Sequence, residues 1–273
     1  ASVPMLDNPR ELHDANALLG LTWSVMFTTG VALGGFVTAY LSPVGAIALD
    51  ALTFIIAAII ALGLPQLPPP ASHEKPKLGI NELIQTWGDL QKIAGARYSL
   101  LAKTPFAIAN AGGWIALNLL AAKSLPTLSL GVALGVLQGV RAIGTGIGPL
   151  VPQRIFPQRS HVATPFVFAG VLIFAYTKTP WLALLGLLLW GMGSGHNFVS
   201  STAELQKLAP GRILGRTVAL DFSLLCSAQA LTAIFCGLLA DFTGDARDCA
   251  VTAVAVGFAT WLLAKKSREP MPD

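Results

Sequence analysis

The sequence predicts an all-α integral membrane protein with about eight transmembrane helices. Of the 273 residues, 53% are hydrophobic and only 12% are charged, whereas soluble domains carry about 25% charged residues. Mean hydropathy is +0.64, and the apolar residues form runs near the ~20 residues that an α-helix needs to cross a bilayer. The lipid bilayer is therefore the expected partner. The net charge of +4 is explained by loop topology without a nucleic-acid partner.

The apolar runs follow one another along the chain and are bounded by prolines, charges or short polar turns. We expect spans at about 15–41, 43–64, 99–122, 127–151, 162–177, 180–207, 213–240 and 248–264. Ser42-Pro43 separates the first two spans, because proline cannot continue the hydrogen-bond ladder of a helix. Pro65 ends the second span, and a basic hinge from Lys207 to Arg216 joins the sixth span to the seventh.

Prolines and charges divide the chain into three parts. Residues 1–64 hold the first two spans, residues 65–98 form a linker, and residues 99–273 hold the other six spans. The linker begins with a proline-rich segment, which excludes regular helix. From Ile80 to Lys92, apolar residues recur at helical spacing between polar ones. This pattern predicts an amphipathic helix at the membrane surface.

The positive charges indicate how the spans are oriented, since cytoplasmic loops carry an excess of Lys and Arg. One side of the predicted topology holds Arg10, Lys75, Lys77, Lys92, Arg97, Lys103, Arg154, Arg159, Lys207, Arg212, Arg216, Lys265, Lys266 and Arg268. The other side holds Lys123, Lys178 and Arg247. Both termini and the linker are therefore expected in the cytoplasm. Arg141 is the one positive charge left within a span.

Arg141 and Asp221 are the most informative candidates for function. Ionisable groups in spanning helices normally face a bundle interior or a wet cavity. Arg141 lies roughly 15 Å and Asp221 roughly 12 Å from the predicted cytoplasmic surface, at 1.5 Å per helical residue. An ion pair between them is possible if their spans are neighbours. It could be a structural lock, or a switch in which protonation of Asp221 releases Arg141.

Other polar residues within the spans are candidates for proton coupling or substrate contact. His196 titrates in a range that suits a proton carrier, but a hydrogen-bonded packing histidine is the alternative. Glu204 either takes part in proton transfer or anchors to nearby basic residues at the interface. The residues that either line a substrate path or make hydrogen bonds between helices are Asn110, Asn118, Gln138, Asn197 and Gln229.

The spans contain no soluble-enzyme motif and predict neither a cofactor nor a metal site. The histidines His13, His73, His161 and His196 lie in separate segments without a close ligand pair. Gly191 and Gly195 lie in a GMGSG run that lacks the strand and the lysine of a phosphate loop. Their small-x-x-x-small spacing predicts close helix packing instead. Gly30 and Gly34 in the first span repeat this spacing.

Local motifs then resemble the major facilitator superfamily, in particular its bacterial drug:proton antiporter and siderophore-exporter branch. NPRELHDANALLG is similar to the family's entry into its fifth helix. The run GVALGG resembles the antiporter motif G-P-x-x-G-G of that helix, with Gly30, Gly34 and Gly35 in place and Val31 at the position where proline is usual.

The hinge after the sixth span resembles the same family. ELQKLAPGRILGRTVAL is similar to the junction between helices ten and eleven, with Gln206, Pro210, Gly215 and Arg216 in place. The resemblance implies that the predicted spans are helices five to twelve of a twelve-helix bundle, so that the first four helices are missing. It also implies that Arg141 and Asp221 line the cavity.

We therefore expect a secondary transporter that exports a small amphipathic molecule, such as a drug, siderophore or metabolite, in exchange for protons. Alternating access would move the site between the two sides of a bacterial inner membrane. The missing helices, or a partner chain that supplies them, would complete the cavity. The alternative is a non-transporting membrane subunit or scaffold derived from such a transporter, since the predicted spans comprise one six-helix half plus a hairpin.

Overall fold

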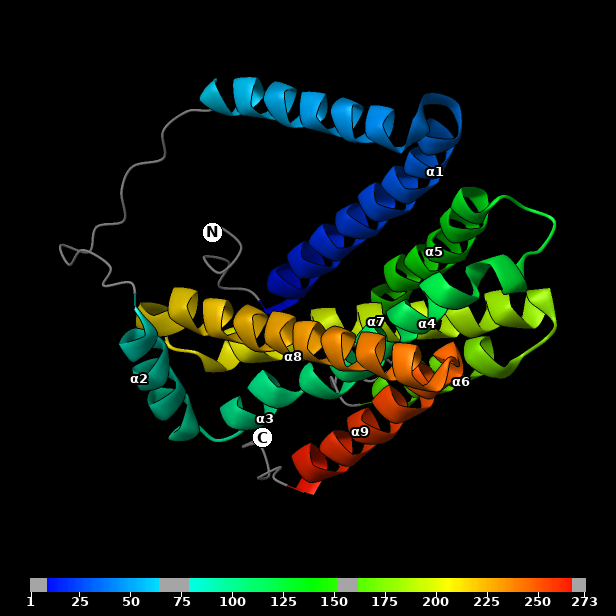
Figure 1. The fold of residues 1–273 in the computed structure, drawn as a ribbon. Helices are drawn as coiled ribbons and strands as arrows, with labels where there is room; N and C mark the ends of the chain where they lie inside the picture. The colour runs from blue at the N-terminus through cyan, green and yellow to red at the C-terminus, as the bar shows by residue number, and fades with distance from the viewer. Residues whose placement is uncertain (1–8, 64–78, 152–161, 267–273) are drawn as a thin grey trace.

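The chain is a bundle of α-helices (Figure 1). The computed structural model describes residues 9–63, 79–151 and 162–266, and within these ranges it contains helices and turns but no strand. The elements are α1 (Pro9–Leu62), α2 (Ile80–Gln91), α3 (Ala96–Leu101), α4 (Thr104–Ser124), α5 (Leu130–Ile147), η2 (Gly148–Leu150), α6 (Thr164–Tyr176), α7 (Pro180–Leu208), η3 (Gly211–Ile213), α8 (Leu214–Thr243) and α9 (Ala246–Lys266). The predicted all-α membrane fold is confirmed.

Six stretches of the described chain are long and apolar enough to cross a membrane. They are Tyr40–Leu62, Ala96–Ser124, Leu130–Leu150, Pro180–Leu208, Leu214–Thr243 and Ala246–Lys265. The other two predicted spans are also helical. Residues 15–41 lie in the first arm of α1, and the span predicted at 162–177 is the 13-residue helix α6. α6 is shorter than a full span because it begins at Thr164 and the backbone becomes extended at Thr177.

α1 is bent into two arms at Ser42 (Figure 1). Ser42 has φ 74° and ψ 163°, which lies outside the helical region. The next residue, Pro43, has no N–H to donate, and its ring disfavours helical backbone in the residue before it. The predicted turn at Ser42-Pro43 is therefore present as a sharp bend. α1 packs against α5 and α7, whereas the stretch Tyr40–Leu62, which contains the second arm, has no buried residue.

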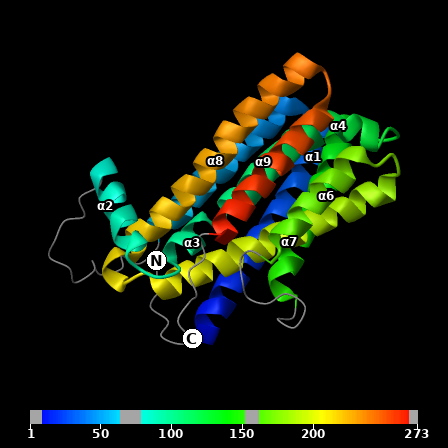
Figure 2. The same cartoon turned by 90° about the horizontal axis from the view of Figure 1, so that it is seen from below.

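The other long helices form a bundle with one main core. α4 packs against α8, α9 and α6, and α7 packs against α5 and α6. Figure 2 shows α8 beside α9 and α6 beside α7. Leu117 from α4, and Leu187 and Trp190 from α7, are fully buried in this core. α4 and α7, which are far apart in the sequence, are thereby held together around the polar groups described below.

α5 and α7 approach each other closely enough that only glycine fits between them. A Cβ atom added at Gly191 would lie 2.0 Å from the backbone oxygen of Arg141, and one added at Gly195 would lie 1.9 Å from that of Thr145. Such separations are well inside van der Waals contact. The packing role predicted for the Gly191 and Gly195 pair is therefore confirmed, and it fixes the position of Arg141 relative to α7.

α2 lies across the ends of α3, α7 and α8. Its residue Leu90 is buried in a second apolar cluster with Leu100 of α3 and Leu205 of α7. Glu82 of α2 also makes a salt bridge with Arg216 of α8. The predicted helix is thus present, with much of its apolar side in contact with the protein. Its location at the membrane surface stays a prediction.

Candidate functional site

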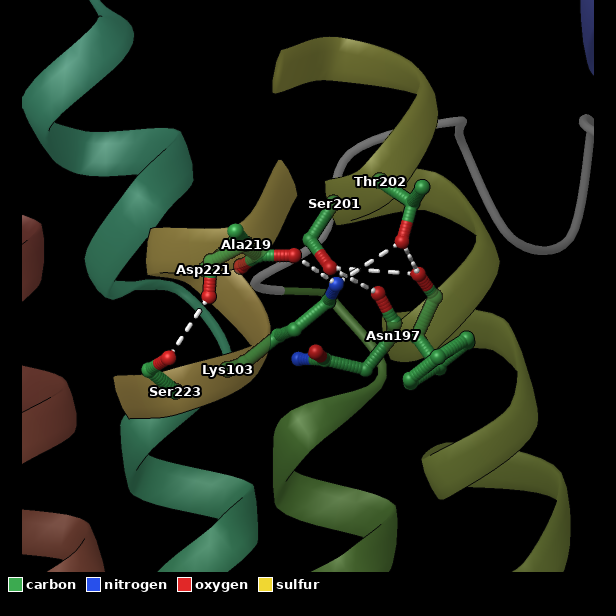
Figure 3. Close-up of polar contacts among 8 residues, drawn as sticks. Lys103, Asn197, Ser201, Thr202, Ala219, Asp221 and Ser223 are labelled. Carbon is green, nitrogen blue, oxygen red and sulfur yellow. Dashed lines mark hydrogen bonds and ion pairs between the residues drawn. The ribbon is translucent and has the colours of Figure 1, made fainter. Parts of the chain in front are cut away.

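Lys103 and Asp221 form a salt bridge inside the bundle (Figure 3). Lys103 precedes α4, and Asp221 lies on α8; their side chains are only 2% and 5% exposed. The Lys103 ammonium also donates a hydrogen bond of 2.8 Å to Thr202 Oγ1. It lies 4.5 Å from the centre of the Phe198 ring. We call these four residues, Lys103, Phe198, Thr202 and Asp221, the lysine–aspartate cluster.

One polar atom in the cluster and one beside it are buried and have no hydrogen-bond partner within the part of the chain that the structure describes. Oδ2 of Asp221 faces Lys103, but Oδ1 is buried without a partner. Thr217 lies one helical turn before Asp221, and its hydroxyl oxygen is likewise buried without a partner. An unsatisfied buried polar atom costs about 1–3 kcal/mol. A group that donates a hydrogen bond to Asp221 Oδ1, or a proton that binds to it, would therefore reduce this energetic cost.

The predicted ion pair between Arg141 and Asp221 is wrong. Asp221 pairs with Lys103 instead. The reason is helix packing: α5, which carries Arg141, lies against α1, α7 and α4, whereas α8 lies against α4, α9 and α2. Lys103, which the sequence places among the charges on the cytoplasmic side, is one of the largest fully buried side chains.

Arg141 belongs to a separate group of residues from α4, α5 and α7, which we call the arginine–tryptophan cluster: Asn110, Trp114, Gln138, Arg141 and Trp190. The Arg141 Nε donates to Gln138 Oε1 at 3.0 Å, and its Nη1 lies 3.5 Å from Asn110 Oδ1. The guanidinium carbon lies 5.3 Å from the Trp114 ring centre and 5.2 Å from that of Trp190. These distances are within the range of cation–π attraction.

The two indoles complete the hydrogen bonding of this cluster. Trp114 Nε1 donates to Gln138 Oε1 and Trp190 Nε1 donates to Asn110 Oδ1, both at 3.0 Å. Each amide oxygen thus accepts from one indole and from the arginine. Asn110, Gln138 and Arg141 are all buried. Of the predicted site residues, these three are brought together.

His196 and Asn197 are buried on α7 and contact different neighbours. His196 Nε2 lies 3.3 Å from the hydroxyl oxygen of Ser200, one turn later on the same helix. The Asn197 amide donates to Thr164 Oγ1 of α6 at 2.9 Å and lies 3.5 Å from the carbonyl oxygen of Ala102. Asn197 therefore ties α7 to the residue that precedes Lys103. The role of His196 in proton coupling stays a prediction.

The remaining predicted polar residues lie at the margins of these clusters. Glu204 is half-buried and accepts a 3.4 Å hydrogen bond from Ser99 of α3. Gln229 is half-buried on α8, and Asn118 is exposed on α4. None of these side chains belongs to the two clusters as we define them. Asn118 lies one turn after Trp114, on the same side of α4.

The motif glycines and hinge residues lie outside the clusters. A Cβ atom added at Gly30 or Gly34 would meet no atom within 4 Å, so the close packing predicted for their face is not found in the described chain. The surroundings of Gly35 lie outside the described residues. Pro210 is exposed in the turn between α7 and α8, and Gly215 is exposed in the first turn of α8. The next residue, Arg216, pairs with Glu82.

Sequence reasoning missed part of each cluster. Lys103, Phe198 and Thr202 were not among the predicted site residues, and neither were Trp114 and Trp190. One signal was present in the spacing: Trp114 follows Asn110 by one helical turn, and Arg141 follows Gln138 by one turn. Side chains three or four residues apart meet on a helix surface, so each pair could have been recognised as a local polar unit. The contact of Lys103 with Asp221 has no such local signal.

A membrane-spanning helical bundle that buries an ion pair and an arginine has the architecture of a transport protein, because intramembrane ionisable groups mark pathways and relays. Residues 8–233 match the family model of the Major Facilitator Superfamily. The match covers most of the chain, which therefore belongs to this superfamily and is a multi-pass secondary transporter. No curated protein and no solved structure matches the chain.

Proposed function

We propose that the chain exports a small amphipathic molecule in exchange for protons, by alternating access across a bacterial inner membrane, with both termini in the cytoplasm. The observation that carries the proposal is the buried salt bridge between Lys103 and Asp221. It joins the start of α4 to α8, and the Lys103 ammonium also contacts α7 through Thr202. A change of charge at this one point therefore acts on three helices.

Protonation of Asp221 would provide that change. Its Oδ2 atom faces Lys103, so Oδ1, which has no partner in the described chain, is the atom that takes the proton. The neutral acid no longer attracts the ammonium, and the link between α4 and α8 weakens. Lys103 keeps its contacts with Thr202 and Phe198 on α7. The helix that is released is therefore α8.

Two further features support export and a two-halved cavity. The GVALGG run of α1 resembles the antiporter motif of proton-driven exporters, which favours outward transport. The stretch Tyr40–Leu62, which contains the exposed second arm of α1, is long and apolar enough to cross a membrane. On this proposal it packs against four further helices, supplied by the same protein or by a partner chain. Substrate then binds between the two halves, as in other transporters built from repeats.

The test uses the full-length protein in inverted membrane vesicles with an imposed pH gradient, acidic inside. The probes are three: 1-naphthalenesulfonate (aromatic anion), N-methylquinolinium (aromatic cation) and hexanesulfonate (aliphatic anion). We expect gradient-driven accumulation of at least one probe. Asp221→Asn should abolish this accumulation but leave exchange down a concentration gradient, because only the coupling to protons is lost.

Asp241→Asn is the matched control, since Asp241 is exposed near the end of the same helix. It should transport like the unmodified protein. Membrane insertion and yield are compared for all variants. Gradient-driven accumulation that is unchanged in Asp221→Asn would remove Asp221 from the coupling mechanism. A protein that accumulates none of the three probes in response to the gradient would contradict proton-coupled export of small amphipathic molecules.

A further inference from the structure

We infer that the arginine–tryptophan cluster binds the substrate, and that the substrate carries an aromatic ring with an anionic group. This inference rests on the proposed function, because it names the class of molecule that the transporter moves. It begins with the construction of the cluster. α4, α5 and α7 each contribute to it, and hydrogen bonds of 3.0 Å hold the Gln138 and Asn110 oxygens against the two indoles.

The cluster is closed on one side and open on the other. Trp190 is completely buried and closes the cluster at α7, whereas Trp114 is 38% exposed. Asn118, one turn further along α4, is exposed as well. An amide that faces hydrocarbon would leave its hydrogen bonds unsatisfied, which is costly in lipid. The side of α4 that carries Trp114 and Asn118 is therefore turned towards a wet cavity.

The charge of Arg141 selects the sign of the ligand. Arginine stays protonated in proteins and presents several N–H donors in a planar fork that matches carboxylates, sulfonates and phosphates. Among the contacts of its guanidinium are the amide oxygens of Gln138 and Asn110, and both of these oxygens are neutral. Hydrogen bonds to a charged acceptor are roughly twice as strong as those to a neutral one. An anion that enters can therefore compete with the two amides for the guanidinium, whereas a cation is repelled.

The exposed indole selects the shape of the ligand. The guanidinium lies over the Trp114 ring, so an anionic group bound to Arg141 is next to a large flat apolar surface. Aromatic rings stack on such a surface in offset or edge-to-face arrangements, with a gain beyond simple burial. A molecule whose ring and anionic group are directly joined can contact Trp114 and Arg141 at the same time. An aliphatic anion makes only the second contact.

The three probes separate these contributions when their binding to the purified full-length protein is measured by equilibrium dialysis without a pH gradient. We expect 1-naphthalenesulfonate to bind at least about tenfold more tightly than N-methylquinolinium, which has a similar ring system and the opposite charge. It should also bind more tightly than hexanesulfonate. These comparisons need no substitution. Equal or tighter binding of the cation would overturn the inference.

Substitutions then assign the two preferences to particular side chains. Arg141→Gln should weaken naphthalenesulfonate binding at least about tenfold, and Arg141→Lys, which keeps the charge, should restore part of it. Trp114→Leu should reduce the preference for naphthalenesulfonate over hexanesulfonate towards unity. Trp181→Leu is the control, because Trp181 is exposed at the start of α7. A full preference for the aromatic anion in Arg141→Gln would overturn the assignment to this cluster.

The inferred substrate class and the proposed function can be refuted independently of each other. Asp221→Asn should still bind naphthalenesulfonate, because Asp221 lies in the other cluster. If the unmodified protein prefers the aromatic anion but shows no gradient-driven transport, the proposed function fails and the binding site stands. If gradient-driven transport is found for N-methylquinolinium alone, the proposed function stands and the inferred substrate class is wrong.

Discussion

Removing one charge of the buried Lys103–Asp221 pair should destabilise the transporter more than removing both. The two side chains are 2% and 5% exposed, so water cannot replace a lost partner. Breaking a buried ion pair from one side costs about 3–5 kcal/mol, because the remaining charge stays buried. Replacing both partners by uncharged groups removes that penalty.

The structure also predicts which of the two single variants loses more stability. In Asp221→Asn, Lys103 keeps the Thr202 hydroxyl and the Phe198 ring, and a desolvated cation–π contact is worth about 2 kcal/mol. The expected loss is therefore near 3 kcal/mol, at the lower end of the range for broken buried pairs. In Lys103→Met, the Asp221 carboxylate loses its one partner in the described chain. The expected loss is near 5 kcal/mol, at the upper end of that range.

The assay is reversible unfolding in mixed detergent micelles, applied to both single variants and to the double variant as a double-mutant cycle. The double variant should be more stable than either single one. The control cycle uses Lys92→Met and Asp89→Asn, whose salt-bridged side chains are 79% and 45% exposed; each should change stability by less than about 0.5 kcal/mol. Additive losses at Lys103 and Asp221, or losses as small as in the control, would refute the reasoning.

Two further predictions concern helix packing. Gly195→Ala should destabilise the bundle by about 1–3 kcal/mol, because the new Cβ atom would lie 1.9 Å from a backbone oxygen of α5. Gly237→Ala is the control: its Cβ atom would meet nothing within 4 Å, so this variant should be neutral or stabilising. A lower unfolding midpoint for Gly237→Ala than for Gly195→Ala would contradict the close crossing of α5 and α7. Leu90→Ala, at a residue 1% exposed, should cost about 2–5 kcal/mol. Arg216→Gln should lower the stability by less than about 1 kcal/mol, because Arg216 and its partner Glu82 are both partly exposed. A larger loss of stability for Arg216→Gln than for Leu90→Ala would show that charge, and not apolar packing, holds α2 in place.

The positions of the helices could be predicted from the sequence because they depend on local physics. Hydropathy over about 20 residues reports the ability to cross a bilayer, and Pro43 marks the bend in α1 because a proline acts on its own neighbours. The linker helix from Ile80 follows in the same way from the spacing of its apolar residues. Two differences are clear: α6 is a helix of 13 residues between Ala163 and Thr177, and the span predicted at 99–122 is divided into α3 and α4, with Lys103 between them.

The contacts between helices could not be predicted from the same information. Arg141 and Asp221 were paired because they lie at similar depths in the membrane, but depth does not say which helices are neighbours. α5, with Arg141, packs mainly against α1 and α7, whereas α8, with Asp221, packs mainly against α4 and α9. Lys103 was counted with the charges on the cytoplasmic side and was not recognised as a buried residue. Its long side chain extends instead into the space between α7 and α8. Hydropathy and charge counts contain no information on which way such a side chain points.

The two clusters are joined by the same pair of helices. Lys103 precedes α4 by one residue and Asn110 lies two turns later, roughly 11 Å along the axis at 1.5 Å per residue. On α7, Trp190 belongs to one cluster, and Phe198, two turns later, belongs to the other. Between them lie Gly191 and Gly195, where α7 meets the backbone of α5 at Arg141 and Thr145.

This arrangement gives proton coupling a physical route. If loss of the Asp221 charge releases α8, α4 and α7 stay joined through Lys103 and move together relative to α8. The close crossing at Gly191 and Gly195 fixes Arg141 to α7, and its guanidinium contacts Asn110 of α4 and Trp190 of α7. The arginine–tryptophan cluster therefore shifts as a unit relative to α8 when Asp221 is protonated. Coupling then requires no direct contact between Arg141 and Asp221, which is the contact that the fold does not provide.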